Sequence, residues 1–443
     1  MNLIDKLISL EESRQQRMIH LNAALSCCPA NVRSALHSAF LNIDAEGLAP
    51  AYLSEYAVEA LENVEVIRGI YQKKRDNRAN KCCEYFNIAE LFTQRMLARV
   101  FSNMLIGEKQ IFVNVQVPTG AIANLCIYQA FLKENDRVLS AGLSYGGHLS
   151  HGADIHYSGK HYRVLTYGVT ARNELDYDQI QHYLMTERPR LVIAGASSFP
   201  RKINWCKIRE LIDQYSPDTL FMADIAHTAG LIAGGVFPSP FGYADIISMV
   251  GYKTFCGARS AAVFTTNIEH SKKLNRAVFP GILGSPINAS IMAMAVSAQN
   301  ANENKYKRLM ACIVNNARVM AKRLKENGIQ LCFDGTDTHM VIIDLKQSGI
   351  NLNGEMAANL LEDCRILVNK NMIPGDVSNA NATGVRIGLT WATQIGFNEE
   401  DICDLSDQIS EILIAGHPSR DSERIYERWS VLSGNEMDYT PER

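Results

Sequence analysis

The sequence predicts an α/β fold, with a mostly parallel sheet in a large domain and a smaller C-terminal α+β domain. Short runs rich in β-branched residues alternate with helical patterns through the middle of the chain. After about residue 290 this alternation gives way to a long helical stretch and a few separate strand-like runs. The 443 residues, 47% of them apolar, are enough to build more than one domain.

The N-terminal region is expected to be largely helical. Residues 3–25 have the spacing of a charged amphipathic helix, which predicts a helical arm over residues 1–36. Residues 44–47 indicate a loop. Helical spacing then runs from Leu53 to Lys74 and again from Tyr85 to Phe101.

The predicted large domain covers residues 37–295. Its expected strands are Ile111–Val115, Arg137–Ala141, Arg163–Thr166, Leu191–Ala194, Thr219–Ala223 and Asp245–Val250. The helices expected between them include Ala121–Leu132, Tyr177–Met185 and Lys207–Tyr215. Ligands bind such sheets beyond the carboxyl ends of the strands, where Asp224 and Lys253 stand.

The predicted small domain covers residues 296–443. A helix over Ala311–Asn327 should end at Gly328, a residue that favours a helix C-terminus. The expected elements after it are strands at Gln330–Phe333 and Met340–Leu345, a helix at Gly354–Arg365 and a strand at Gly384–Leu389. The polar tail from Gly416 is expected to be partly loose.

Composition narrows the class of protein. A net charge of -3 gives no sign of a nucleic-acid or membrane partner. The start lacks the apolar core of a signal peptide, and no apolar stretch approaches the ~18 residues of a membrane span. Eleven cysteines without a Cys-x-x-Cys pair indicate free thiols in a reducing cytoplasm. No metal site is expected, because His148 and His151 have no carboxylate or third ligand near them in the sequence.

Two short segments carry the candidate chemistry. Asp224 ends one apolar run, His227 follows it, and Lys253 comes just after a second run. A lysine after a strand is usually a surface residue, but a carboxylate at the end of a central strand needs a partner. Pyridoxal phosphate would supply one, with Lys253 as the Schiff-base amine and Asp224 against the ring nitrogen. His227 would orient a carboxylate or bind a carbonyl in either case.

Three further positions suit such a site. The turn Thr119-Gly120-Ala121 follows a strand and opens a helix, so its backbone N–H groups could cradle a phosphate, although most such turns only connect elements. Tyr145, before two glycines, could stack on an aromatic ring. Arg386, inside a strand, needs either a structural carboxylate or a substrate carboxylate, and the sequence does not separate the two.

Together these residues resemble the serine hydroxymethyltransferase family from about Ala45 to Phe397. The segments that carry the resemblance are Tyr145–Gly152, Asp224–Pro240, Tyr252–Thr254, Ala277–Gly281, Gly335–His339, Val368–Asn371 and Gly384–Gly388. The resemblance implies a pyridoxal-phosphate transferase of fold type I with a seven-stranded sheet.

The resemblance also implies roles for individual residues. Lys253 would be the Schiff-base lysine, with Asp224 on the pyridine nitrogen and His227 beside it. The other implied cofactor contacts are Thr119, Gly120, Ala121, Tyr145, Ser197 and Tyr252, plus Gly284 and Ser285, which would reach the phosphate of a neighbouring subunit in a homodimer or dimer of dimers. Arg386 would clamp the substrate carboxylate, Glu46 would manage protons, and Phe279 and Asn371 would stand on the folate side.

Several positions depart from the family. Tyr145 is predicted to replace the histidine that stacks on the ring, and Tyr252 replaces the histidine before the lysine. Asp44 stands for a tyrosine. The closing Cys83-Glu84-Tyr85 arrives some 26 residues late, and Ala79-Asn80 stands for the tyrosine pair before it. The cofactor and carboxylate residues are kept while the second-substrate side is rebuilt, which predicts a specialised member.

Three functions are compatible with this pattern. The first is hydroxymethyl transfer between serine and glycine, or a close analogue, with tetrahydrofolate as the one-carbon carrier and Glu46 as the base. The second is a folate-independent aldolase or transaldolase for threonine-like substrates, which the lost tyrosines and the inserted segment 48–80 favour. The third is a non-catalytic cofactor-binding protein, against which the intact Lys253, Asp224 and Arg386 argue.

Overall fold

The structure is a computed structural model that describes residues 2–50, 56, 58–61, 63–74, 78–417 and 423–434. Its centre is a seven-stranded sheet with the order β2-β8-β7-β6-β5-β3-β4. The strands are β2 (Phe112–Asn114), β3 (Arg137–Ala141), β4 (Arg163–Tyr167), β5 (Leu191–Ala194), β6 (Leu220–Asp224), β7 (Ile246–Val250) and β8 (Ala261–Thr265). Only β8 runs against the others, so the mostly parallel sheet is confirmed.

All six strands expected in this part are present, within two residues at each end. The seventh strand, β8, is an addition to the expected elements. Its first two residues, Ala261 and Ala262, have weak strand preference, so the run resembles a continuation of the turn after Lys253.

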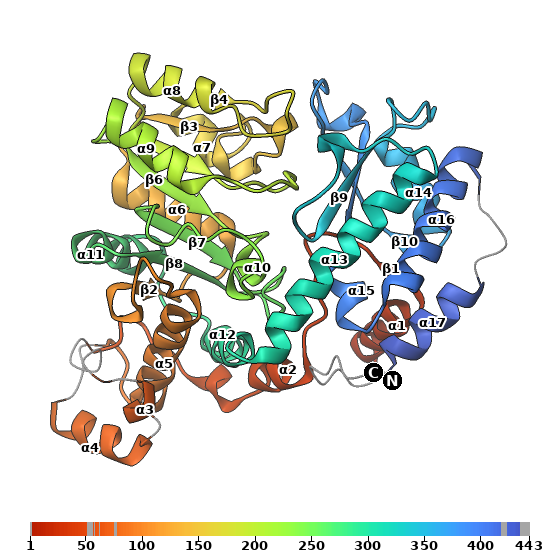
Figure 1. Ribbon diagram of the computed structural model, residues 1–443. Coiled ribbons are helices and arrows are strands. Elements are labelled where there is room, and N and C mark those ends of the chain that lie inside the picture. Colours follow the sequence, from red (N-terminus) through yellow and green to blue (C-terminus); the bar gives the residue numbers. More distant parts are fainter. Residues whose placement is uncertain are drawn as a thin grey trace.

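Helices cover both faces of the sheet, and alternation along each strand explains why (Figure 1). In β6, Phe221 and Ala223 lie in one apolar core while Leu220 and Met222 lie in another. The second core is closed by α6 (Gly120–Phe131) and α11 (Ile268–Arg276). The first core is closed mainly by α5 (Glu84–Phe101), α8 (Tyr177–Thr186), α9 (Trp205–Tyr215), α10 (Ala229–Ala233) and α12 (Asn288–Ala301).

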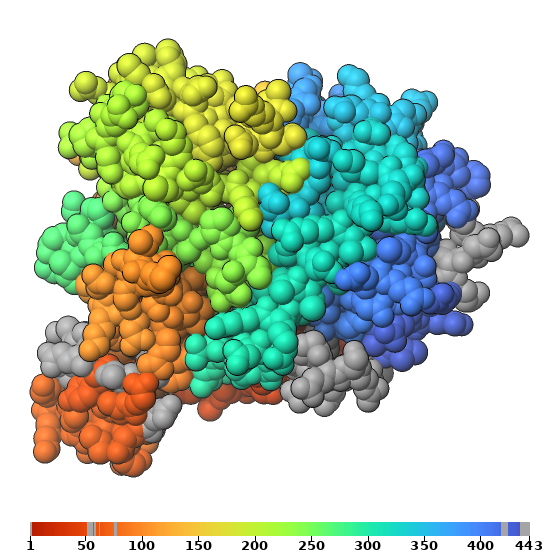
Figure 2. All heavy atoms as spheres, in the orientation of Figure 1, coloured from red at the N-terminus to blue at the C-terminus, as the bar shows by residue number. Residues whose placement is uncertain are grey.

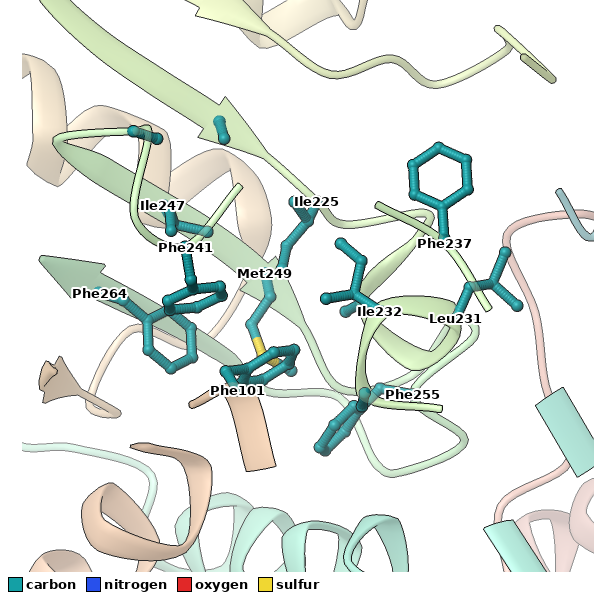
Figure 3. Close-up of a cluster of buried hydrophobic side chains, with 14 of the residues drawn as sticks. Phe101, Ile225, Leu231, Ile232, Phe237, Phe241, Ile247, Met249, Phe255 and Phe264 are labelled. Atoms are coloured by element: carbon teal, nitrogen blue, oxygen red, sulfur yellow. The ribbon is translucent and has the colours of Figure 1, made fainter. Parts of the chain in front are cut away.

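The interior beneath the ends of β6 and β7 is densely aromatic. Phe101 of α5 stacks on Phe241 at 5.1 Å between ring centroids and meets the edge of Phe264 at 5.3 Å. Figure 3 shows these rings together with Ile225 and Met249. Ile225 directly follows Asp224, so the loop that carries this carboxylate is anchored in a packed core.

The C-terminal part is built around a second apolar cluster. A three-stranded antiparallel sheet has the order β11-β12-β9, formed by Asn369–Asn371, Gly384–Gly388 and Met340–Asp344. Its helices are α13 (Asn304–Glu326), α14 (Gly354–Asp363), α15 (Thr390–Gln394), α16 (Glu399–Ala415) and α17 (Glu423–Ser433). α13 contributes Leu309 to the first cluster and Met320 to the second, so it joins the two parts, whose side chains meet in Figure 2.

The N-terminal helix is shorter than expected. Helix α1 spans Leu3–Arg17, and β1 (Ile19–His20) then pairs in parallel with β10 (Ile366–Leu367). The prediction of one helix over residues 3–25 was therefore wrong at its end. Ile19 and Leu21 are fully buried in the C-terminal cluster, and this burial outweighs the helical spacing of the sequence. The domain limits at residues 36 and 295 stay predictions.

Two other expectations need correction. Gln330–Phe333 is not a strand, because Leu331 makes only an isolated bridge and Cys332–Asp334 forms a 3-10 turn with Phe333 at a φ of +65°. The tail after Gly416 contains α17, whose Trp429 is fully buried, while residues 418–422 and 435–443 lie outside the described part.

The segment expected to be helical from residue 53 to 74 forms α3 (Val58–Leu61) and α4 (Val64–Lys74) where it is described. Residues 51–55, 57 and 62 of that expectation lie outside the described part. None of the described helices is long and apolar enough to cross a membrane.

Candidate active site

A cavity of about 170 Å³ opens at the carboxyl ends of β5, β6 and β7. The predicted residues that line it are Thr119, Gly120, Ala121, Ser197, Asp224, His227, Tyr252 and Lys253. Parallel strands bring these positions together because their carboxyl ends share one edge of the sheet. The turn before α6 closes one side, where the Thr119 hydroxyl accepts a hydrogen bond from the Ile122 amide.

Lys253 is buried in this cavity with only 7% of its surface exposed. Its Nζ lies 3.0 Å from Nε2 of His227. Burial lowers the pKa of Lys253 to about 8; the Asp224 charge opposes this shift, and Arg386 and Arg259 add to it. More of this amine is therefore uncharged near neutral pH than in an exposed lysine, and the uncharged amine is the state that attacks a carbonyl carbon.

Asp224 is held as an anion by three hydrogen bonds. Its Oδ2 accepts from Nε2 of His151 at 2.9 Å and from Nδ2 of Asn124 at 3.0 Å, and its Oδ1 accepts from the Ala226 amide at 3.0 Å. Burial alone would raise the pKa of Asp224, but the contacts with His151 and Asn124 outweigh it and hold that pKa well below its usual range.

A chain of polar contacts links Asp224 to His148. Ser248 donates to Oδ1 of Asn124 at 3.0 Å, which fixes the amide so that Nδ2 donates to both Asp224 and Ser150. The Ser150 hydroxyl lies 2.7 Å from Nδ1 of His148. Since this hydroxyl accepts from Asn124, it donates to His148, which leaves the proton of a neutral His148 on Nε2.

Asn124, His148 and His151 also line the cavity, although none of them was predicted from the sequence to contact the cofactor. His148 and His151 were considered only as metal ligands. Their spacing carried no further signal, because a short 3-10 turn, Leu149–His151, is needed to direct both rings to one side.

Tyr145 does not line the cavity around Lys253, and this corrects the prediction that it takes the place of the stacking histidine. The following glycines explain the difference. Gly146 has a φ of +92°, and a Cβ on Gly147 would lie 2.1 Å from the Ala141 carbonyl oxygen. The chain therefore turns sharply at these two residues and brings His148, not Tyr145, into the cavity.

Tyr145 instead lines an adjoining cavity of about 350 Å³. His148 and His151 border both cavities, and Met372, next to the predicted folate-side residue Asn371, borders the second. Asn371 itself is half-buried and donates to the Met372 carbonyl at 2.5 Å.

Arg386 lies behind Ser197 rather than in the wall of the cavity. Its Nη1 donates to the Ser197 carbonyl at 2.6 Å and to the Ser197 hydroxyl at 3.2 Å, and its Nη2 donates to Oδ1 of Asn369 at 3.3 Å. Burial lowers the pKa of Arg386 to about 10. No carboxylate of the described residues pairs with Arg386, so its charge is not balanced by a structural salt bridge within that part of the chain.

Arg259 is a further cation at the cavity, at a position that the sequence did not single out. Its guanidinium lies 4.5 Å from the centre of the Tyr252 ring, and both residues line the cavity. Tyr252, at the position before the lysine, is thus in contact with a positive charge.

The structure does not bring every predicted site residue into this cavity. Glu46 and Phe279 are half-buried elsewhere, and Gly284 and Ser285 are exposed. The segment before Glu46 is nevertheless bonded to the segment after the exposed loop, because Nδ2 of Asn288 donates to the Ile43 carbonyl at 2.6 Å.

The residues around the cavity fit pyridoxal phosphate. Asp224 is a buried anion suited to a protonated pyridine nitrogen, and the free N–H groups at the start of α6 suit a phosphate. The buried amine of Lys253 suits a Schiff base. These residues therefore offer a partner for the ring nitrogen, the phosphate and the Schiff-base carbon of that cofactor.

Comparison with known proteins agrees with this geometry. Residues 71–409 match the family model described as serine hydroxymethyltransferase. The chain is 35% identical over 411 residues to serine hydroxymethyltransferase 2 of Salmonella typhi, which covers 92% of this chain and 89% of that protein. It is 36% identical over 409 residues to serine hydroxymethyltransferase of Lactobacillus acidophilus, covering 92% and 90%. The chain therefore belongs to the serine hydroxymethyltransferase family, whose members are pyridoxal-phosphate-dependent transferases of fold type I that use tetrahydrofolate.

Proposed function

We propose that this protein interconverts serine and glycine, or close analogues, by making and breaking the Cα–Cβ bond of a β-hydroxy amino acid. Tetrahydrofolate is the proposed one-carbon carrier. The observation that supports an amino-acid substrate is the environment of Arg386. This buried cation has no carboxylate partner among the described residues and is bonded to Ser197, which lines the Lys253 cavity. A substrate carboxylate is the bidentate partner that such a guanidinium lacks.

The residues of the cavity have separate proposed tasks. Lys253 holds the cofactor covalently and exchanges it for the substrate amine. Asp224, kept anionic by His151 and Asn124, holds a proton on the pyridine nitrogen. The turn Thr119-Gly120-Ala121 binds the phosphate. Pyridoxal phosphate, when bound, supplies an aromatic ring that accepts the electrons released at Cα.

The tasks of the histidines follow from their contacts. Nε2 of His227 is 3.0 Å from Lys253 Nζ and 3.5 Å from the Ser197 hydroxyl. Burial and the nearby Lys253 hold the pKa of His227 well below its usual range, so it remains neutral and its Nε2 can accept a hydrogen bond from Lys253. We assign ring stacking to His148. This residue lines the cavity, and its Nδ1 is already bonded to the Ser150 hydroxyl.

Arg386 and Ser197 are proposed to orient the substrate. A carboxylate bound by the guanidinium limits rotation about the bond between nitrogen and Cα, and so selects which bond at Cα breaks. Loss of the contact between Arg386 and the carboxylate should therefore change both substrate binding and which bond at Cα breaks.

Glu46 is proposed as the base at the substrate hydroxyl, acting in the cavity of a partner subunit. It does not line the cavity of its own chain. The segment that carries it is bonded to the helix after Gly284 and Ser285, the loop proposed to reach a partner's phosphate. In the proposed homodimer, one interface brings both Glu46 and the Gly284–Ser285 loop to the partner's cavity. Phe279, five residues before Gly284, is proposed to lie on the same surface.

The second cavity supports a separate binding place for the carrier or the aldehyde. It adjoins the first through His148 and His151 and includes Tyr145 and Met372. Asn371, next to Met372, is the proposed folate-side contact. The eleven free cysteines support a reducing compartment, and the cytoplasm is the compartment we propose.

A folate-independent aldolase of threonine-like substrates is the second candidate, favoured by Ala79 and Asn80 at the positions of the tyrosine pair. The deciding experiment loads the protein with pyridoxal phosphate and glycine and follows Cα proton exchange with and without tetrahydrofolate. Acceleration by tetrahydrofolate, together with serine formation from a one-carbon folate, supports the proposal. Exchange that ignores folate while acetaldehyde is consumed would replace it with the aldolase.

A further inference from the structure

A buried polar network surrounds Arg78, outside the Lys253 cavity. Arg78, Asn87, Glu90 and Gln116 are each at most 3% exposed. Arg78 forms an ion pair with Glu90 through Nη2 and donates from Nε to Oδ1 of Asn87 at 2.6 Å. Gln116 donates to the other carboxylate oxygen of Glu90 at 2.7 Å. Both carboxylate oxygens of Glu90 are thus bonded, one to a cation and one to an amide donor.

Further donors of this network bind the backbone around Glu46. Nη1 of Arg78 donates to the carbonyls of Ala45 at 2.5 Å and Gly47 at 2.8 Å, and Gln116 donates to the Gly47 carbonyl at 2.9 Å. The Ala79 amide donates to the carbonyl of Glu46 itself at 3.1 Å. Three consecutive carbonyls are therefore bonded, while the Glu46 side chain stays half-exposed.

The turn at Gly47 is shaped by Arg78. Gly47 has a φ of +116°, and a Cβ there would lie 3.3 Å from Cα of Arg78. The two residues are 31 positions apart in the chain. The chain therefore leaves this point after Gly47 and comes back to it at Arg78, which contacts Gly47.

The described part of that segment packs elsewhere. Leu61 and Ile67, from α3 and α4, form a small apolar cluster with Ile88 and Leu91 of α5. Figure 1 shows α3 and α4 beyond α5, away from the large sheet, and Figure 2 shows the same region projecting from the body. Asn87 and Glu90 of α5 belong instead to the Arg78 network, so the added helices and the Glu46 backbone rest on different side chains of one helix.

We propose that Arg78, with its partner Glu90, is the positioning residue for Glu46: it holds the backbone of the proposed base in place and separates it from the inserted segment. This inference rests on the role proposed for Glu46. Buried ion pairs contribute little net stability compared with apolar residues of similar size, so the geometry they impose is the reason to keep one here.

The test replaces the pair as a unit, with the double variant Arg78→Met and Glu90→Met. Apolar replacement of both partners preserves packing but removes the donors to the Ala45 and Gly47 carbonyls. We expect kcat for serine cleavage to fall roughly 10- to 100-fold, the scale of a misplaced catalytic group. We also expect the Ala79 amide to lose protection against hydrogen exchange, while the cofactor spectrum and the Kd for glycine stay unchanged.

Two comparisons isolate the effect. The exposed pair Arg68–Glu65 on α4, 3.0 Å apart, is the matched control, and its replacement by Met at both positions should change none of these readouts. Adding Glu46→Gln to the Met pair should lower kcat no further than Glu46→Gln does alone, because both act through one side chain. Independent, multiplicative losses would overturn the proposal.

The outcomes also separate this inference from the proposed function. If Glu46→Gln leaves kcat unchanged, the role of Glu46 is wrong, and the positioning role fails with it. If Glu46→Gln lowers kcat but the Met pair does not, only the positioning role is wrong. Should the Met pair fail to fold, Gln116→Met decides: it removes one donor to Gly47 and keeps the ion pair, and a partial loss of kcat with unchanged glycine binding supports the proposal, whereas no loss contradicts it.

Discussion

Nε2 of His151 donates a hydrogen bond to Oδ2 of Asp224 across 2.9 Å, and both side chains are at least nine-tenths buried. The bond ties the end of β6 to the loop after β3, two neighbours of one strand in the sheet. It is a main reason that the pKa of Asp224 stays low in spite of burial. The residue proposed to keep the cofactor ring protonated thus depends on a histidine 73 positions away.

Replacing His151 by Ala should weaken this control. A hydrogen bond to a charged group is worth about 1.5–3 kcal/mol, so kcat/KM for serine cleavage should fall roughly 10- to 100-fold. The absorbance of the bound cofactor should respond to pH over a range in which the parent protein is constant. The exposed His182→Ala is the control and should behave as the parent. A parent-like spectrum and rate in the His151 variant would contradict the assignment.

Substitutions of His148 and of Tyr145 should show which of the two residues contacts the cofactor. His148→Ala should raise the Kd for pyridoxal phosphate about 2- to 10-fold, the scale of one aromatic contact, and alter its spectrum. Tyr145→Ala, which also removes a ring, should leave both unchanged, because Tyr145 borders only the second cavity. Equilibrium binding of the cofactor to the apoprotein is the measurement. The reverse ranking of the two variants would restore Tyr145 as the stacking residue.

The rate at which apoprotein recaptures pyridoxal phosphate should depend on pH through Lys253. Only the neutral amine attacks the aldehyde, so the rate should rise as pH passes through about 8. Arg386 is one of the charges that lower this pKa. Removing it in Arg386→Gln favours the ammonium form and should move the midpoint to higher pH. Arg386→Lys keeps the charge and should shift the midpoint less; equal midpoints in all three proteins would exclude this coupling.

Arg386→Gln should also lose most discrimination for substrates with a carboxylate. Removing one partner of a buried charge pair costs about 2–5 kcal/mol, which predicts a fall in kcat/KM for serine of roughly 30- to 5000-fold. Ethanolamine, which has the same amine but no carboxylate, should be processed or bound equally by parent and variant. An equal loss for both compounds would indicate a structural role for Arg386.

Gly195 should be required for the position of Asp224. Its φ is +119°, and a Cβ there would lie 2.0 Å from the Asp224 carbonyl oxygen. Gly195→Ala should therefore destabilise the fold by more than about 1–2 kcal/mol and weaken cofactor binding. Gly235, with a φ of +75° and no described atom within 4 Å of where its Cβ would lie, is the matched control. Gly235→Ala should show the backbone strain alone, in thermal denaturation, with normal cofactor affinity.

Local patterns were enough for the large sheet and for the centre of the site. The strand Leu191–Ala194 was predicted residue for residue because a buried parallel strand is a continuous apolar run, and Arg137–Ala141 was predicted equally well from its apolar centre. Asp224 and Lys253 could be paired from sequence since both end such runs, and adjacent parallel strands end together. β1 could not be predicted, because Ile19 and His20 pair with residues almost 350 positions later, beyond any local signal.

The sequence by itself determined the fold class, the cofactor and the family of this protein, because each depends on residue types at short spacing. Only the tertiary structure decided which aromatic side chain faces the cofactor cavity, since the turn at Gly146 and Gly147 exchanges Tyr145 for His148. It also decided that Arg386 has no carboxylate partner among the described residues, and that Arg78 returns to Glu46. Those relationships join groups far apart in the chain, and only packing in three dimensions brings them within hydrogen-bonding distance.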